Sequence, residues 1–266
     1  MAGPFSLVSG SEQLTAVSAK VYSGYVREKN PDGSYRTETY AFGNGGLVSA
    51  AHVGADAVGI ELNGAPAGGG VVRDPTIDDV GFGALSRMLA HSLAEQSFVP
   101  AQDPNATNLL IMVYWGRSAG SYMERDGYLK DAIDAWNAQL MGFDSEHVFQ
   151  VRTDASTVFF GRTLQSMILD NVHSSLITAI EMDRYYVVLR AFDFQTAWKQ
   201  RRIKLLWETR FSLSERQHDF EKELPTMAHT ASKYFGQDTK GLIRARISEG
   251  QIEIGEVKSL GNVPEN

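Results

Sequence analysis

The segment GRSAG, residues 116–120, contains the residue types that most directly suggest chemistry. It fits the G-x-S-x-G motif, which in serine hydrolases places the nucleophilic serine on a sharp turn between a strand and a helix. A strand-like apolar run precedes it. Downstream, Asp193 and then His218 and His229 give the chain order Ser–Asp–His. Ser118 would then be the nucleophile, either histidine the base, and Asp193 the residue that orients that base.

The residues around this motif do not have the organisation of a serine hydrolase. The helix of such a turn begins at the serine, whereas here Gly120 and Gly127 follow and helical periodicity begins only near Tyr128. The chain before the motif also lacks the repeated strand–helix–strand units that build a parallel sheet. We therefore predict a non-enzymatic protein in which Gly116, Ser118 and Gly120 let a buried strand leave the core. A serine hydrolase that uses Ser118 is the alternative.

Four side chains near the end of this strand are predicted to bind a partner. They are Tyr114, Arg117, Tyr122 and Tyr128. Tyrosine and arginine are enriched at the energetically important centres of binding surfaces, because they combine a large contact area with polar groups. The partner would be a protein or a small molecule.

The histidines do not form a recognisable metal motif. His91 and Glu95 are four residues apart, and Asp170 and His173 are three apart, so each pair would share one helix face. Two ligands do not make a metal site, and hydrogen bonds on a helix surface explain both pairs equally well. We predict no metal and no cofactor.

The composition limits the classes of partner. The chain has 266 residues, a formal net charge of −7 and 43% hydrophobic residues, which is typical of a globular protein. The single basic cluster, KQRRIK at 199–204, is interpreted as a solvated hairpin tip, so no nucleic-acid partner is predicted. The absence of cysteine excludes disulfides and thiolate metal sites. No apolar run reaches the roughly 18 residues that indicate a transmembrane helix.

Periodicity and turn residues predict the following elements. A hairpin is expected over 15–42, around the turn Asn30-Pro31-Asp32-Gly33, and a long Gly-rich loop over 43–75. Thr76 and Asp79 resemble a capping box before a helix. The remaining predicted elements are a helix through 82–93, a strand at 108–115, helices at 124–141 and 162–180, strands at 184–194 and 203–213, a helix from Pro225 to Gly236, and a hairpin around Glu249-Gly250.

These elements predict an α+β protein, one domain over 1–266, with a mostly antiparallel sheet, helices packed on one face and a helical insertion at 120–182. In the strand at 203–213 the apolar residues alternate with Lys204, Glu208, Arg210 and Ser212, so this strand should have one face in water.

Two blocks of the chain resemble a family of exported bacterial proteins, many of them lipoproteins, that is defined as a domain of unknown function. The first block is TIDDVGFGALSRMLAHSLAEQSFVPAQDPNATNLLIMVYWG. The second contains YYVVLRAFDFQTAWKQRRIKLLWETRFSL and the closing LPTMAHTASKYFG. The Gly-rich loop and the segment at 120–182 depart from that family's pattern, and the chain has no cysteine for lipid attachment.

The resemblance implies an α+β domain of the periplasm or outer cell envelope, and it carries over no catalytic residues. The first residues, MAGPFSLVSGSEQ, lack a basic segment and a sustained apolar run, so they do not form an intact signal peptide. We expect a leader, with or without a lipid anchor, on a precursor; otherwise the protein would be cytoplasmic. The predicted function is that of a non-enzymatic envelope protein that binds a partner or acts structurally.

Overall fold

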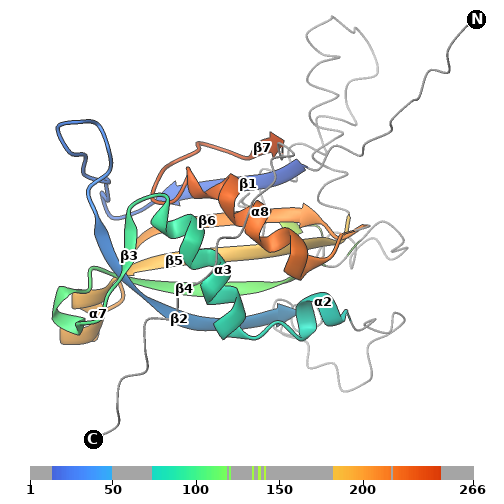
Figure 1. Cartoon of the computed structure of the whole chain (residues 1–266), viewed down its shortest axis with the longest axis horizontal. Coiled ribbons are helices and arrows are strands. Elements are labelled where there is room, and N and C mark those ends of the chain that lie inside the picture. The colour runs from blue at the N-terminus through green and yellow to red at the C-terminus, as the bar shows by residue number, and fades with distance from the viewer. Residues whose placement is uncertain are drawn as a thin grey trace, which may run out of the picture.

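The computed structural model describes residues 14–49, 74–118, 120, 134, 137–138, 141, 182–216 and 218–246. The strands among these residues form one sheet in the order β3-β2-β4-β5-β6-β1-β7 (Figure 1). The strands are β1 (Leu14–Val21), β2 (Glu38–Ser49), β3 (Phe98–Pro100), β4 (Leu109–Arg117), β5 (Arg184–Asp193), β6 (Leu205–Ser214) and β7 (Ile243–Arg246). The helices are α2 (Pro75–Asp78), α3 (Phe82–Ala94), α7 (Phe194–Gln200) and α8 (Phe220–Ser232), with a 3-10 turn at Pro104–Ala106.

The sheet is mixed, so the predicted fold class with its mostly antiparallel sheet is wrong. Strand β2 pairs in parallel with both β3 and β4, whereas β4, β5, β6, β1 and β7 pair antiparallel in turn. The parallel part exists because the chain crosses over through α3 after β2 and returns in the same direction. Periodicity identifies strands but does not give their directions within a sheet.

The predicted hairpin over 15–42 is also wrong, although its turn forms. The Gly33 N–H donates to the Asn30 carbonyl at 2.9 Å, and the Ser34 N–H donates to the Asp32 carboxylate at 2.9 Å. The two strands nevertheless do not pair with each other, since β1 lies between β6 and β7 and β2 lies between β3 and β4. The turn is therefore the tip of a long connection that crosses one end of the sheet (Figure 1).

Helices α3 and α8 lie side by side over one face of the sheet (Figure 1). The core between them and the sheet contains the apolar side chains of alternating strand residues. Helix α8 begins at Phe220 with Asp219 as its N-cap, so Pro225 lies inside it and not at its start. Asp74 caps α2, in place of the predicted capping box of Thr76 and Asp79. The strands predicted at 108–115, 184–194 and 203–213 are confirmed.

Residues 43–49 belong to β2 and not to the predicted loop. Gly43 and Gly45 lie beneath the side chains of Met112 and Tyr114 on the neighbouring strand β4. A Cβ atom on Gly45 would lie 2.5 Å from the Tyr114 ring, and Gly46 has a φ of +100° at the bulge of the ladder. The glycines that suggested a loop are therefore strand residues that give room to their neighbours.

We expect Gly45→Ala to lower the free energy of unfolding by about 1–3 kcal/mol, because the new methyl group forces the Tyr114 ring out of its place. Chemical denaturation measures the change. Gly83→Ala is the matched control, since its Cβ would meet nothing closer than 3.8 Å and alanine favours the helix. An equal loss in both variants would contradict this account of β2.

Several sequence predictions lie outside the described residues. They include residues 50–73 of the Gly-rich loop, the predicted helix at 162–180, and the candidate binding residues Tyr122 and Tyr128. Within the predicted insertion at 120–182, the structure describes Gly120, Asp134, Asn137, Ala138, Met141 and Met182. Among the described residues, no helix is both long enough and apolar enough to cross a membrane.

Candidate functional site: a strand-end cluster and a basic sheet face

Ser118 follows the last residue of β4 and continues the pairing with β5. Its N–H donates to the carbonyl of Arg184 at 2.9 Å, and its hydroxyl accepts from the Arg184 N–H at 2.9 Å. The hydroxyl also donates to the Met182 carbonyl at 3.3 Å. Ser118 is buried. Its side chain therefore closes the end of the β4–β5 ladder and does not stand on an exposed turn.

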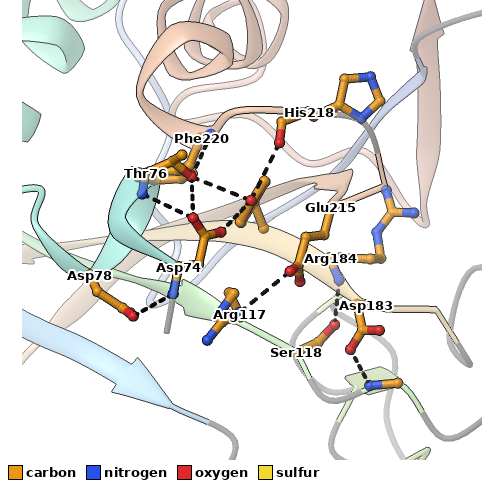
Figure 2. A network of polar contacts seen from close by, with 12 residues as sticks. Asp74, Thr76, Asp78, Arg117, Ser118, Asp183, Arg184, Glu215, His218 and Phe220 are labelled. Atoms are coloured by element: carbon orange, nitrogen blue, oxygen red, sulfur yellow. Dashed lines mark hydrogen bonds and ion pairs between the residues drawn. The ribbon is translucent and has the colours of Figure 1, made fainter. Parts of the chain in front are cut away.

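The other members of the predicted triad lie elsewhere. Asp193 ends β5 and caps α7, nine residues from Arg184 along an extended strand, a separation of about 30 Å. The His218 Nδ1 atom contacts the Ser214 carbonyl at 2.7 Å, and its ring lies away from Ser118 (Figure 2). The His229 Nδ1 atom contacts the Glu95 carboxylate at 2.9 Å on the surface of α8. These contacts do not assemble Ser118, Asp193 and a histidine.

A cluster of polar contacts surrounds Ser118 at this end of the sheet (Figure 2). The Tyr185 hydroxyl donates a short hydrogen bond to the Asp74 carboxylate, which also accepts from the N–H and hydroxyl of Thr76 at 2.9 and 2.7 Å. The Thr76 hydroxyl in turn accepts from the Phe220 N–H at 3.3 Å. The cluster thus joins the starts of α2 and α8 to β5.

Burial and neighbouring charge account for the titration of this cluster. Burial and the hydrogen bond to Asp74 raise the pKa of Tyr185. Burial alone would raise the pKa of Asp74, but the hydrogen bonds from Tyr185 and Thr76 outweigh it and lower that pKa. Asp74 therefore stays an anion that holds a protonated tyrosine, which is a structural arrangement and not that of a general base.

Arg117, one of the predicted binding residues, is held in the same cluster. Its Nη1 atom lies 3.4 Å from the Glu215 carboxylate. Burial raises the pKa of Glu215, and the charge of Arg117 opposes that rise. The adjacent Asp183 carboxylate accepts from the Gly120 N–H at 2.6 Å, and a Cβ on Gly120 would lie 2.7 Å from that carboxylate. The second glycine of the motif, Gly120, is thus explained by a close contact with Asp183.

Ser118→Ala is expected to lower the free energy of unfolding by about 1–3 kcal/mol, because the buried Arg184 N–H loses the Ser118 hydroxyl as its acceptor. Chemical denaturation of the two proteins measures this loss. Ser86→Ala on α3 is the control, since the Ser86 hydroxyl only contacts its own helix and alanine favours helices. A fluorophosphonate probe should not label the native chain; labelling that disappears in Ser118→Ala would restore the hydrolase alternative.

The face of the sheet turned away from α3 and α8 is polar and rich in arginine. Register places its side chains in rows: Lys20 opposite Glu208, and Glu208 opposite Arg190; Arg210 opposite Val188, and Val188 opposite Tyr114. The next row contains Arg244, Ala16, Ser212 and Tyr186, with Arg184 two residues before Tyr186 on β5. We call this surface the basic face: Lys20, Tyr114, Arg184, Tyr186, Arg190, Glu208, Arg210, Ser212 and Arg244.

Among the strand residues that the structure describes, the basic face has five cationic side chains and one carboxylate. This excess of positive charge contrasts with the net charge of −7 of the whole chain. The prediction that this side of β6 lies in water is wrong, since Glu208 and Ser212 are both buried. Arg184 and Glu208 are buried, Arg190 and Arg210 are partly buried, and Lys20 and Arg244 are exposed. Charges arranged in rows in this way make a surface that can discriminate between charged groups.

Glu208 is held between two arginines. The Nε atoms of Arg190 and Arg210 each lie 2.6 Å from one of its carboxylate oxygens. Burial alone would raise the pKa of Glu208, but the hydrogen bonds and charges of Arg210 and Arg190 outweigh it and lower the pKa. The Arg190 guanidinium also lies 5.6 Å from the centre of the Tyr114 ring. Tyr114, a predicted binding residue, therefore belongs to the basic face.

Arg184 has a different environment. Its side chain is buried, with the residue 7% exposed. Its Nε atom donates to the Ser212 hydroxyl and an Nη atom to the Ser212 carbonyl, both at 3.1 Å. No carboxylate of the described residues forms an ion pair with it. Burial, together with the nearby positive charge of Arg244, lowers its pKa to about 10.

The sequence prediction missed Arg184, Arg190 and Glu208 as candidate functional residues. The apolar character of the segment RYYVVLRAFD predicts a strand, and its two arginines belong to no recognisable motif. Their spacing was an available signal, since residues 184 and 190 share one face of a strand. Which residues on β6 and β7 oppose them could not be known before the strand order.

Comparisons with known proteins identify no family for this chain. No family model matches the sequence, and no curated protein matches it either. Among solved structures, the chain is similar to a PDZ domain protein from Parabacteroides distasonis, with a TM-score of 0.39 and 10% sequence identity. The match covers 88% of this chain and 39% of the other, so the chain spans about two fifths of that protein's length. In the part of the chain that the structure describes, no group of three or more acidic or histidine side chains is placed to hold a metal ion.

Proposed function

We propose that this protein is a non-enzymatic binding protein of the cell envelope that holds an anionic group, a carboxylate or a phosphate, against the basic face. The observation that carries the proposal is the buried Arg184, which donates to Ser212 and lies near a second cation, Arg244. The resemblance of two sequence blocks to a family of exported bacterial proteins supports the envelope as its location.

Burying the charge of Arg184 has a free-energy cost. Removing a guanidinium from water costs several kcal/mol unless an opposite charge and hydrogen bonds compensate for it. The Ser212 oxygens accept two of the five N–H groups of Arg184 and supply no formal charge. A carboxylate or phosphate between Arg184 and Arg244 would supply that charge, and the planar guanidinium suits both anions.

The rest of the face fits a ligand that also has apolar or aromatic parts. Tyr186 and Val188 form a small buried cluster with Tyr114 packed against it. This cluster lies between Arg184 and the Arg190–Glu208–Arg210 group, which is already balanced by its own carboxylate. The geometry therefore assigns recognition of the anionic group to Arg184, and contacts with the apolar or aromatic parts of the ligand to Tyr114 and Tyr186.

A test compares anion binding by the native full chain and by Arg184→Met. Inorganic phosphate and a short glutamate peptide are titrated at constant ionic strength while the thermal midpoint is followed. We expect at least one of the two probes to raise the thermal midpoint of the native chain. Arg184→Met should bind that probe at least about tenfold more weakly, which corresponds to the loss of one hydrogen bond to a charged group.

The ligand-free stability of Arg184→Met separates binding from folding. The relief of a buried charge offsets the loss of two hydrogen bonds, so its free energy of unfolding should change by less than about 2 kcal/mol. The control is Arg87→Met on the exposed surface of α3, which should bind both probes like the native chain. Equal binding by Arg184→Met and the native chain would reject the proposal.

A further inference from the structure

A short exposed segment lies at the end of the sheet opposite Arg184. Helix α7 starts at Phe194, where Asp193 caps it, and the chain turns back into β6 through Arg201, whose φ is 55°. All residues from Trp198 to Lys204 are exposed. We call this segment, WKQRRIK, the α7 tip; Figure 1 shows α7 extending beyond the ends of β4 and β5.

The α7 tip combines positive charge with exposed apolar side chains. Lys199, Arg201, Arg202 and Lys204 provide four cations, and the segment has no acidic residue. Lys204 lies 3.9 Å from the Asp193 carboxylate, and the other three cations form no ion pair with the described residues. Trp198 is 40% and Ile203 83% exposed. Leaving two large apolar side chains in water has a free-energy cost that a binding surface would recover.

The tip is fixed to the sheet and is not a loose loop. The Gln195 side chain donates to the carbonyls of Pro104 and Thr107, both at 2.8 Å, which ties α7 to the segment before β4. The rings of Phe194 and Trp198 pack at 5.9 Å, and the Lys199 ammonium lies 5.7 Å from the Trp198 ring centre. Trp198 and the cations therefore project from a segment that is held in a fixed position on the sheet.

We infer that the α7 tip docks this protein on an anionic membrane surface, with Trp198 and Ile203 entering the interfacial region and the four cations lying among the lipid head groups. Tryptophan prefers the membrane–water interface, and lysine and arginine beside it extend to the phosphates. A stable protein interface uses about 20–30 residues on each side, many more than the seven of the tip. A bilayer needs only a small projecting element.

Charge distribution also favours a membrane. The tip has four positive charges in a chain with a net charge of −7, so the remainder has a net charge of −11 (−7 − 4). An anionic surface therefore attracts the tip and on balance repels the remainder, although the basic face is positive. This orients the molecule with α7 toward the lipid. Binding should therefore depend steeply on the fraction of anionic lipid and on ionic strength.

The test is co-sedimentation of the full chain with vesicles of phosphatidylcholine alone or mixed with phosphatidylglycerol. We expect binding to the mixed vesicles at low salt and much weaker binding to the neutral ones. Arg201→Gln/Arg202→Gln should weaken binding about 20–30-fold, about fivefold for each cation near an anionic surface. Trp198→Ser/Ile203→Ser should weaken vesicle binding about tenfold or more. If Trp198 enters the interfacial region, vesicles should shift the tryptophan emission of the native chain, and this shift should be absent in the double variant.

Arg87→Gln/Lys233→Gln is the matched control, because it removes the same charge from exposed positions in α3 and directly after α8. It should bind mixed vesicles within about twofold of the native chain, since charge on the far helices lies outside the docking surface. Three results would overturn the inference: no binding to the mixed vesicles, an equal loss in the control, or binding of the tip to polyglutamate or a duplex oligonucleotide without binding to vesicles. None of these depends on Arg184.

Discussion

Glu208→Gln is expected to lower the free energy of unfolding by about 2–4 kcal/mol at neutral pH. The substitution keeps the shape of the side chain but removes the charge that lies 2.6 Å from the Nε atoms of both Arg190 and Arg210. Breaking a buried pair from one side leaves uncompensated charge, which costs about 3–5 kcal/mol. Arg190 is 40% exposed at its side chain, so water reduces part of that cost.

The pH dependence of this difference provides a second measurement. The pKa of Glu208 is lowered in the folded protein, so its stabilising effect is complete above the unfolded pKa of about 4.3 and is lost as pH falls through the lower folded pKa. The stability difference between the native chain and Glu208→Gln should therefore be constant above about pH 5 and shrink below about pH 4. A constant difference down to pH 3 would contradict this.

Glu28→Gln is the matched control for Glu208→Gln. Glu28 accepts from Arg36 at 2.6 Å, but both side chains are about 70% exposed. Exposed pairs contribute little because water already solvates both charges, so this variant should be nearly as stable as the native chain. Two equal losses would show that the burial of Glu208 has no energetic consequence.

Trp207→Ala has the largest expected effect on the core, a loss of about 3–5 kcal/mol. Trp207 is fully buried on β6. Its ring stacks on Phe235 at 6.1 Å and lies 5.7 Å from Phe98, so it joins the segment after α8 to the edge strand β3. The loss combines the transfer of the removed indole to water with the cavity that the rigid neighbours cannot fill.

Chemical denaturation measures this loss, and Trp198→Ala is its control. Trp198 has the same side chain but is 40% exposed on α7, so its removal should change the free energy of unfolding by less than about 1 kcal/mol. Trp207→Phe should lie between the two, because the phenyl ring fills part of the space. A loss for Trp198→Ala as large as that for Trp207→Ala would mean that α7 has a structural role.

Local elements could be predicted from the sequence wherever the signal is contained within one segment. The leucines of α3 recur at helical spacing, and the apolar run of β4 is continuous, so both elements were predicted and are confirmed. Trp207 lies among the apolar residues that alternate with polar ones in β6, so its burial was also predicted and is confirmed. The turn at 30–33 depends only on proline and glycine at adjacent positions, and it also forms.

The candidate sites could not be predicted in this way, because they depend on residues far apart in the chain. Ser118 is buried because Arg184, 66 residues later, pairs with it at the end of β4. The G-x-S-x-G pattern describes only five adjacent residues and contains no information about that pairing. Likewise, the cations of the basic face come from β1, β5, β6 and β7, and each looks like an ordinary surface residue in its own strand.

The sequence by itself thus determined the positions of α3, β4, β5 and β6 and the turn at 30–33, since propensity, alternation and turn residues act over a few residues. Tertiary structure alone decided that β1 and β2 separate to different parts of a mixed sheet. It also decided that Gly43 and Gly45 belong to a strand and that Arg184 is buried near Arg244. The physical reason is that strand order, burial and electrostatic environment arise from contacts between distant segments, which no local pattern records.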